Sequence, residues 1–168
     1  MTAVIPHMSN PEFSTPELPA LGIVAALDDD DRRLLSDYGE FLPVQAEADL
    51  IKEGQEQDCL FFVISGLLHA HSEKDGRRAL LGRIEPGETI GEMAVFAPAA
   101  ASANVTAQEF TQVWKATRAD LMAFLEAYPE AGGRLLLEIA AELSRRIRGL
   151  VDKLSAAELE VAIQSHFH

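Results

Sequence analysis

Cysteine is almost absent from this 168-residue chain, and long apolar segments are absent too. The one cysteine, Cys59, excludes an intrachain disulfide framework, and its place in the apolar segment Cys59–Ile64 predicts a buried thiol that packs as a small hydrophobic group. The N-terminal region has no basic residues ahead of an apolar stretch, and the segment Leu21–Leu27 is too short for a signal sequence or a membrane span. We therefore expect a soluble, cytoplasmic protein without a membrane partner.

Positive charge is also scarce. The chain has 14 Lys and Arg residues against 27 Asp and Glu residues, which gives a formal net charge of −13. A protein with this charge repels nucleic acid phosphates and acidic membrane surfaces unless a local basic patch overrides the repulsion. We therefore expect no direct contact with nucleic acid.

Recognisable catalytic motifs are missing as well. The sequence has no Gly-x4-Gly-Lys phosphate loop and no Ser/His/Asp set at a familiar spacing, so we do not expect an enzyme. His69, His71 and Glu73 raise the alternative of a cupin-type metal site. Glu73 follows His71 too closely for the cupin pattern, however, and no histidine lies between residues 72 and 165. We expect both histidines to face solvent and no metal to bind.

Short β-type segments separated by turn residues occupy residues 41–116. Glycines recur there at intervals of 10 to 12 residues from Gly54 to Gly87, a rhythm that is typical of an all-β sandwich or barrel. The segment Lys74–Arg77 has Asp-Gly at its centre, which is the signal of a type I′ hairpin turn. These patterns predict a compact antiparallel β-roll.

Helical signals lie on both sides of this region. Asp28 is placed to cap a helix, and the acidic residues Asp29–Asp31 suit the positive end of its dipole. Thr117 and Asp120 have the spacing of a capping box, and Pro129 suits the first turn of a last, long helix.

One hydrophobic core is expected, because 168 residues with 48% hydrophobic content fit a single domain. We divide the chain into a flexible, proline-rich arm over residues 1–20, a β-roll with flanking helices over 21–128, and a C-terminal helix over 129–168. The expected fold class is α+β, mainly β, with an antiparallel jelly-roll-like β-roll between the helices.

Apolar residues repeat along the last helix at alternating intervals of four and three, which is the pattern of a coiled-coil seam. The first turns can pack on the protein's own roll, but a helix that runs to about Gln164 is about 50 Å long at 1.5 Å per residue and extends beyond a roll of this size. We therefore expect a homodimer. The predicted dimer residues are Leu136, Ala140, Leu143, Ile147, Leu150 and Leu154, and the repeat continues to Ala157 and Val161.

Two segments, Ile84–Phe96 and Ala101–Ala107, together resemble the phosphate-binding cassette of cyclic-nucleotide-binding domains. The resemblance covers about residues 25–155 and includes Phe62–Gly66 in the roll. It implies a double-stranded β-helix with a short cassette helix at Gly91, whose free N–H groups and dipole would face a cyclic phosphate. The residues that it places at the ligand are Ile90, Gly91, Glu92, Met93, Ala101, Ser102 and Ala103, to which we add Arg146 from the last helix.

The cassette departs from the family pattern at one important position. The family keeps a phosphate-binding arginine ten residues after the cassette glycine, where this chain has Ala101. Alanine supplies neither the charge nor the planar fork of an arginine. No shift of the alignment restores that arginine, because residues 93–114 contain no Lys or Arg.

Three interpretations of this departure stay open. The pocket binds a cyclic mononucleotide through Glu92, Ser102 and backbone amides, with Arg145 or Arg146 reaching in from the last helix. Alternatively, it binds a cyclic dinucleotide such as cyclic di-GMP, as some activators of this family do. In the third interpretation the pocket is vestigial, and the domain serves for dimerisation or docking.

The resemblance implies a stand-alone, dimeric regulatory module that signals through ligand-dependent or constitutive contacts with a protein partner. Activators of the family append a helix-turn-helix after the dimer helix, whereas this chain stops about 14 residues past Leu154. The sensor part of a truncated transcription regulator is the alternative. We assign no certain cofactor, and the composition suggests a bacterial source.

Overall fold

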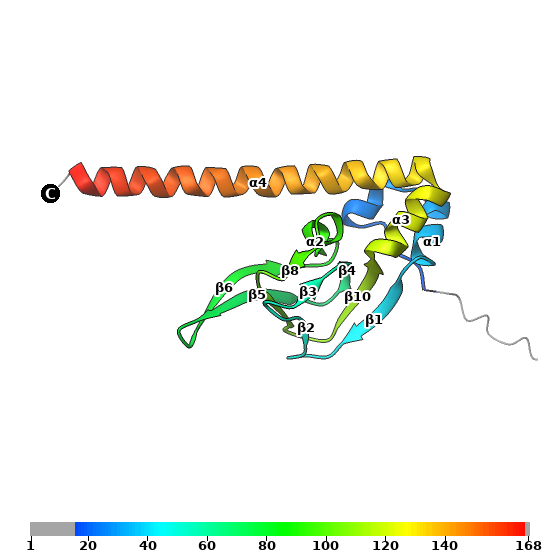
Figure 1. Cartoon of the computed structure of the whole chain (residues 1–168), viewed down its shortest axis with the longest axis horizontal. Helices are drawn as coiled ribbons and strands as arrows, with labels where there is room; N and C mark the ends of the chain where they lie inside the picture. The colour runs from blue at the N-terminus through cyan, green and yellow to red at the C-terminus, as the bar shows by residue number, and fades with distance from the viewer. Residues whose placement is uncertain (1–15, 167–168) are drawn as a thin grey trace, which may run out of the picture.

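The computed structural model describes residues 16–166, and β-strands dominate its middle (Figure 1). The elements in chain order are η1 (Gly22–Ala26), α1 (Asp29–Ser36), β1 (Glu40–Val44), β2 (Asp49–Ile51), β3 (Glu56–Gln57), β4 (Cys59–Ser65), β5 (Leu68–Lys74), β6 (Arg77–Ile84), β7 (Thr89–Ile90), α2 (Glu92–Phe96), β8 (Ala99–Ala100), β9 (Asn104–Ala107), β10 (Thr111–Thr117), α3 (Arg118–Ala127) and α4 (Pro129–His166).

The strands form an antiparallel roll, as predicted. One four-stranded sheet has the order β1-β10-β4-β7, a second has the order β2-β9-β5-β6, and β3 pairs with β8. The β5–β6 hairpin turns at Asp75 and Gly76, whose φ angles of 54° and 71° are the positive values that a type I′ turn requires.

Strand β4 connects two hydrophobic clusters because both of its faces are covered. Leu60 and Phe62 belong to a cluster that contains Trp114 of β10 and residues of the helices. Phe61 and Val63 point the other way, into a cluster that lies within the roll. A strand that is buried on both faces needs a continuous apolar sequence, which explains the run from Cys59 onward. Cys59 is buried as predicted, and burial raises the pKa of its thiol to about 11.

The helix starts follow their capping residues. The side chain of Asp28 accepts a hydrogen bond of 2.8 Å from the backbone N–H of Asp31 at the start of α1. Thr117 and Asp120 form the predicted capping box at the start of α3. These local signals are confirmed because each one depends only on neighbouring residues.

The expectation of a flexible arm over residues 1–20 is wrong for the part that the structure describes. Leu18 is buried at 3% exposure in the helix-side cluster, and its N–H donates to the Ser36 hydroxyl oxygen at 2.9 Å. Residues 16–20 therefore belong to the folded domain. Leu18 fills an apolar site even though prolines lie on both sides of it in the sequence. Residues 1–15 lie outside the described part.

His71 also differs from expectation. We expected it to face solvent, but it is buried at 6% exposure, and its Nε2 lies 2.8 Å from the hydroxyl oxygen of Thr106. That hydroxyl donates in turn to Asp49 at 2.7 Å, so a polar chain stabilises the ring on the sheet. Among residues 16–166 the structure contains no group of three His, Cys, Asp or Glu side chains able to hold a metal ion.

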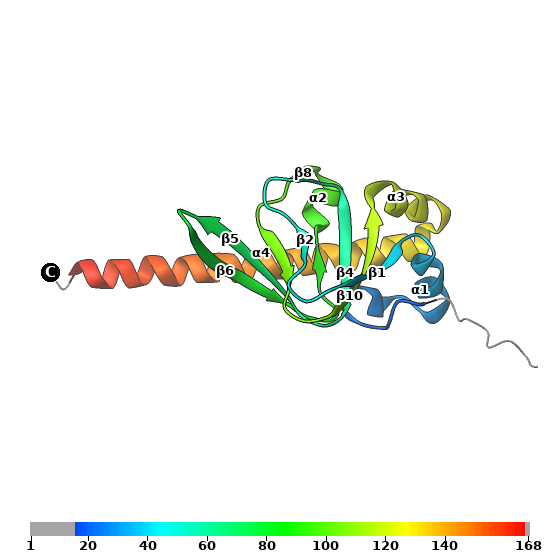
Figure 2. The same cartoon turned by 90° about the horizontal axis from the view of Figure 1, so that it is seen from below.

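Helix α4 lies across the helical end of the molecule and continues well past the roll (Figures 1 and 2). Its buried stripe consists of Ala131, Leu135 and Ile139, which pack in the helix-side cluster. We expected the seam to make this contact, but Leu136 is 37% exposed and only Leu143 packs partly against the cluster. The buried stripe and the seam are therefore neighbouring faces of one helix. No helix within residues 16–166 is long and apolar enough to cross a membrane.

Candidate functional site

The segment that resembles a cassette forms a tight turn into α2. Gly91 is the N-cap of this helix, with φ of 84°, and a Cβ at this position would lie 2.2 Å from the carbonyl oxygen of Cys59. Only glycine combines this backbone angle with so close an approach. At the other end of α2, the Arg118 guanidinium donates to the carbonyl oxygens of Val95 and Phe96 at 2.5 and 3.1 Å. Both ends of α2 are thus fixed to the roll.

A cavity of about 660 Å³ lies beside α2. It is bordered by strand β6, by the segment from β7 into α2, by the segment around β8, and by Arg146 of α4. The eight residues predicted at the ligand all line it: Ile90, Gly91, Glu92, Met93, Ala101, Ser102, Ala103 and Arg146. Their role toward a ligand stays a prediction, but the structure does bring them together.

Arg146 closes the α4 side of this cavity through three sets of contacts. One Nη donates to the Glu92 carboxylate, and the other donates to the Thr89 carbonyl oxygen at 3.0 Å. Its Nε donates to the Glu142 carboxylate at 3.1 Å. We name this arrangement of Glu92, Arg146 and Glu142 the clasp, because it connects the cassette to the long helix.

Glu92 is buried at 5% exposure, which is unusual for a carboxylate. Burial raises the pKa of this carboxyl above its ordinary value, while its hydrogen bond to backbone and the charge of Arg146 act in the opposite direction. Its Oε2 is buried without a hydrogen-bond partner. At the other end of the clasp, Arg145 and Arg146 lower the pKa of the more exposed Glu142.

The backbone of Ala101 is already hydrogen-bonded to the segment at Gly54 and Gln55. The N–H of Ala101 donates to the Gln55 carbonyl oxygen, and its own carbonyl oxygen accepts from Gly54, both at 2.8 Å. Its amide is therefore not free for a phosphate, while Ser102 beside it is exposed. This part of the cassette lacks both the cationic side chain and an available amide at the position of the family's arginine.

Several residues at the cavity escaped the sequence analysis. These are mainly the wall from β6, which comprises Leu81, Gly82, Arg83 and Ile84, together with Thr89, whose carbonyl oxygen accepts from Arg146. The clasp residue Glu142, which does not line this cavity, was also missed. The short β-type segment after the Asp-Gly turn indicated a strand, but only the pairing of β6 with β5 places that strand at the cavity. No local pattern connects Glu142 with a residue 50 positions earlier in the chain.

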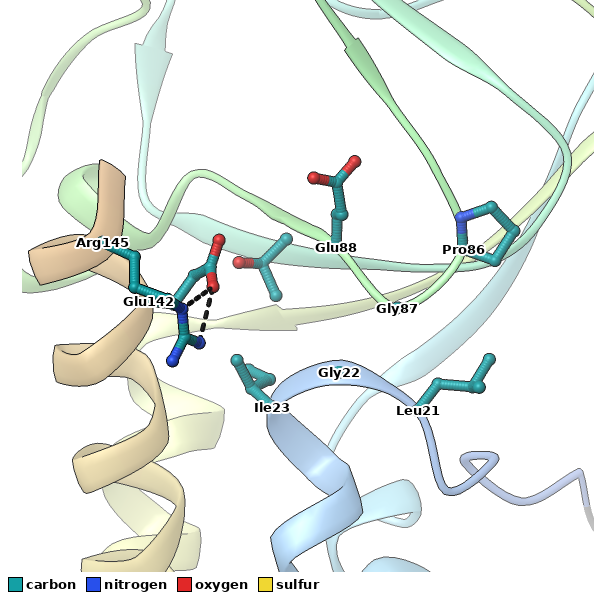
Figure 3. A pocket seen from close by; sticks show the side chains of 9 residues that line it. Leu21, Gly22, Ile23, Pro86, Gly87, Glu88, Glu142 and Arg145 are labelled. Atoms are coloured by element: carbon teal, nitrogen blue, oxygen red, sulfur yellow. Dashed lines mark hydrogen bonds and ion pairs between the residues drawn. The ribbon is translucent and has the colours of Figure 1, made fainter. Parts of the chain in front are cut away.

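Arg145, which was the alternative to Arg146, faces a different cavity (Figure 3). This second cavity of about 330 Å³ lies between η1, the turn at Pro86 and Gly87, and α4. Arg145 donates there to Glu142 at 2.8 Å, as the dashed lines in Figure 3 show. Glu142 thus contacts both arginines, and Arg145 does not line the cavity beside α2.

The chain matches the family model of the cyclic nucleotide-binding domain over residues 41–128. Since this match covers more than half of the chain, the protein belongs to the cyclic nucleotide-binding domain family. The family is one of regulatory ligand-binding domains, so the chain is a cyclic-nucleotide-binding-like regulatory domain.

Similar proteins include the N-terminal domain of a transcriptional regulator from Streptomyces coelicolor A3(2), with a TM-score of 0.67, 29% identity and coverage of 76% of this chain and 90% of that one. A cyclic nucleotide-binding-like protein from Brucella abortus has a TM-score of 0.56, 28% identity and coverage of 63% and 91%. The neuropathy target esterase sws of Drosophila melanogaster is 25% identical over 134 residues, which are 74% of this chain but only 9% of that protein.

The raised pKa of Glu92 predicts a pH dependence of stability. A carboxyl whose folded-state pKa lies above its unfolded value binds protons more readily in the folded state, so lowering the pH through the folded-state value stabilises the fold. We expect the free energy of unfolding of the wild type to rise, relative to that of Glu92→Gln, as the pH falls from 7 toward the unfolded value. Urea unfolding of both proteins at pH 7 and pH 5 measures this difference. A free energy of unfolding of the wild type, relative to that of Glu92→Gln, that is independent of pH or that falls as the pH is lowered would contradict the assignment.

Proposed function

We propose that this protein is a dimeric regulatory module in which the occupancy of the cassette cavity controls the long helix α4. The observation that carries the proposal is Arg146, which extends from α4 to the buried Glu92 of the cassette. A ligand that enters the cavity meets Glu92 and Arg146 directly, and it therefore changes the contact that fixes α4 to the roll. The output is a contact of the dimer with a protein partner.

The clasp lies beside the seam on the same turns of α4. Arg146 directly precedes Ile147, and Glu142 directly precedes Leu143, so each clasp residue is next to a seam residue. Successive residues of an α-helix differ by about 100° in direction, which places the clasp and the seam on adjoining faces. A shift or rotation of α4 that relaxes the clasp therefore also moves the seam.

A second copy of this chain is the occupant that we propose for the seam. On the turns that follow Leu143, the side chains of Ile147, Leu150 and Leu154 are 60%, 60% and 65% exposed, and the heptad repeat continues along the helix. Two parallel copies would place equal positions opposite one another, as a coiled coil requires. Burial of each large apolar side chain contributes about 1.5–3 kcal/mol, so a few heptads are enough to associate two helices.

The cassette of this module is degenerate in our proposal, because Ala101 replaces the cation that would hold a cyclic phosphate. We propose no catalytic activity, and the esterase in the name of the Drosophila relative lies in a protein of which this chain matches 9%. The Streptomyces coelicolor relative is a domain of a transcriptional regulator, and a sensor within a longer regulator would use the same cavity and seam.

Acidic substitutions in the seam test whether the protein dimerises through it. Leu150→Glu together with Leu154→Glu should give monomers, because dimerisation would bury unpaired carboxylates. Both side chains lie outside the helix-side cluster, so the roll should fold unchanged. The matched control is Ser155→Glu with Ala156→Glu, which adds the same charge on the opposite face. Sedimentation velocity should find a dimer for the wild type and the control. A dimer that persists in the seam variant would refute this interface.

The degenerate cassette is tested by restoring its cation. Ala101→Arg should tighten the binding of cyclic AMP or cyclic GMP about ten- to a hundredfold, because a hydrogen bond to a charged group contributes about 1.5–3 kcal/mol. Calorimetry at one fixed salt concentration measures the change, and Ala101→Lys is the control that adds charge without the planar fork. Micromolar binding by the wild type with no gain in the arginine variant would show that another residue anchors the phosphate.

A further inference from the structure

The wall of the cassette cavity is largely aliphatic. Strand β6 and the roll contribute apolar side chains, and so does the segment from β7 into α2. The main apolar lining residues are Ile51, Leu81, Ile84, Ile90, Met93 and Val105. Its volume of about 660 Å³ lies in the range of about 300–1,000 Å³ that is usual for small-molecule sites.

The charged side chains at this cavity offer little to an anion. Of the described residues that line it, Arg83 and Arg146 carry positive charge, and Glu88 and Glu92 carry negative charge. Arg146 is bound to two carboxylates and a carbonyl oxygen, and the exposed Arg83 lies 3.4 Å from the carboxylate of Glu85, which is also exposed. An anionic group that entered would compete with existing ion pairs in a protein with a net charge of −13.

One buried polar atom of the cavity-lining residue Glu92 lacks a partner. Oε2 of Glu92 is buried without a hydrogen bond, although the other oxygen of the same carboxylate accepts from Arg146. A buried acceptor without a donor costs free energy, and a hydroxyl or N–H group on a ligand would remove that cost. The carboxylate is fixed in place by Arg146, so the position of the required donor is also fixed.

We propose that the ligand of this cavity is an uncharged, largely apolar small molecule that carries a hydroxyl or N–H donor for Glu92. The proposal rests on the proposed function only in taking this cavity as the ligand site, and it does not depend on the dimer. Aliphatic walls bind the body of the molecule, and Glu92 orients its donor. Ala101 is then suited to its position, because a small apolar side chain leaves room where a cyclic phosphate would need an arginine.

Three related dyes distinguish the ligand classes. N-phenylnaphthylamine is neutral, has one N–H donor and fluoresces strongly in apolar surroundings. Anilinonaphthalene sulfonate has the same rings and N–H with an added negative charge, and phenylnaphthalene has neither the N–H nor the charge. Fluorescence titration gives the affinity of the first dye, and its displacement gives the affinities of the other two. The monomeric variant Leu150→Glu with Leu154→Glu is the background, because it removes two exposed leucines that could bind a dye.

A cavity-filling variant locates the bound dye. Gly82 lines the cavity, and a Cβ there has no atom within 4 Å, so Gly82→Phe places a ring in the cavity without a clash at the backbone. Ala79→Phe is the matched control, since Ala79 is an exposed residue of the same strand outside the cavity. Ala101→Leu fills the cavity from the opposite wall if the first variant does not fold.

We expect N-phenylnaphthylamine to bind with a stoichiometry of one, and both other dyes to bind about tenfold or more weakly, because one adds an unpaired charge and the other loses the donor. Gly82→Phe or Ala101→Leu should weaken binding at least about tenfold, whereas Ala79→Phe should not change it. Equal or tighter binding of the sulfonate, or binding that is insensitive to both cavity variants, would overturn the proposal. Tight cavity binding in a chain that never dimerises would refute the dimeric module and leave this ligand class standing.

Discussion

The contact between Arg146 and Glu92 is the constraint on which the arrangement of this protein depends. It is the place where the long helix contacts the cassette, whereas the apolar cluster holds α4 through Ala131, Leu135 and Ile139, with Leu143 partly packed against it. The C-terminal part of α4 extends past the β5–β6 hairpin, as Figure 1 shows. The ion pair lies on the same turns of α4 as the seam residues Leu143 and Ile147, so it connects the cassette to that part of the helix.

Two opposing effects act on the charge of Glu92 in this contact. Burial favours the neutral form of Glu92, whereas the guanidinium of Arg146 favours the charged form, and the first effect is the larger. One oxygen of the Glu92 carboxylate accepts a hydrogen bond from Arg146, but Oε2 accepts none. A ligand that displaces Arg146 from Glu92 must itself contact this buried carboxylate, because a buried charge left without a partner strongly destabilises the fold.

Local and short-range features of the fold were predictable from the sequence. The Asp75–Gly76 turn, the caps at Asp28 and Thr117, and the strand that contains Cys59 all depend on patterns within a few residues. The cassette residues were also predictable, because the family motif orders them along the chain. These signals describe which element forms, and they were sufficient for the roll.

Features that depend on pairing between distant segments were not predictable. Leu18 reads as part of a proline-rich arm, yet it fills a site beside Ser36. On α4 the heptad pattern identified the exposed seam. The residues that pack on the domain, such as Leu135 and Ile139, lie on a neighbouring face that this pattern does not include. Periodicity identifies apolar faces of a helix, but it does not say which face meets the chain itself and which one awaits a partner.

The central claim, that the clasp couples the cavity to the seam, is tested most directly by a double-mutant cycle on the dimer dissociation constant. Glu92→Gln, Arg146→Met and the double variant are compared with the wild type by sedimentation equilibrium. The account predicts that each single variant changes the constant in the same direction, by about 1 kcal/mol or roughly fivefold, and that the double variant changes it no further than Arg146→Met alone, because both substitutions remove the Glu92–Arg146 contact. A dissociation constant that stays at the wild-type value in both single variants would contradict it.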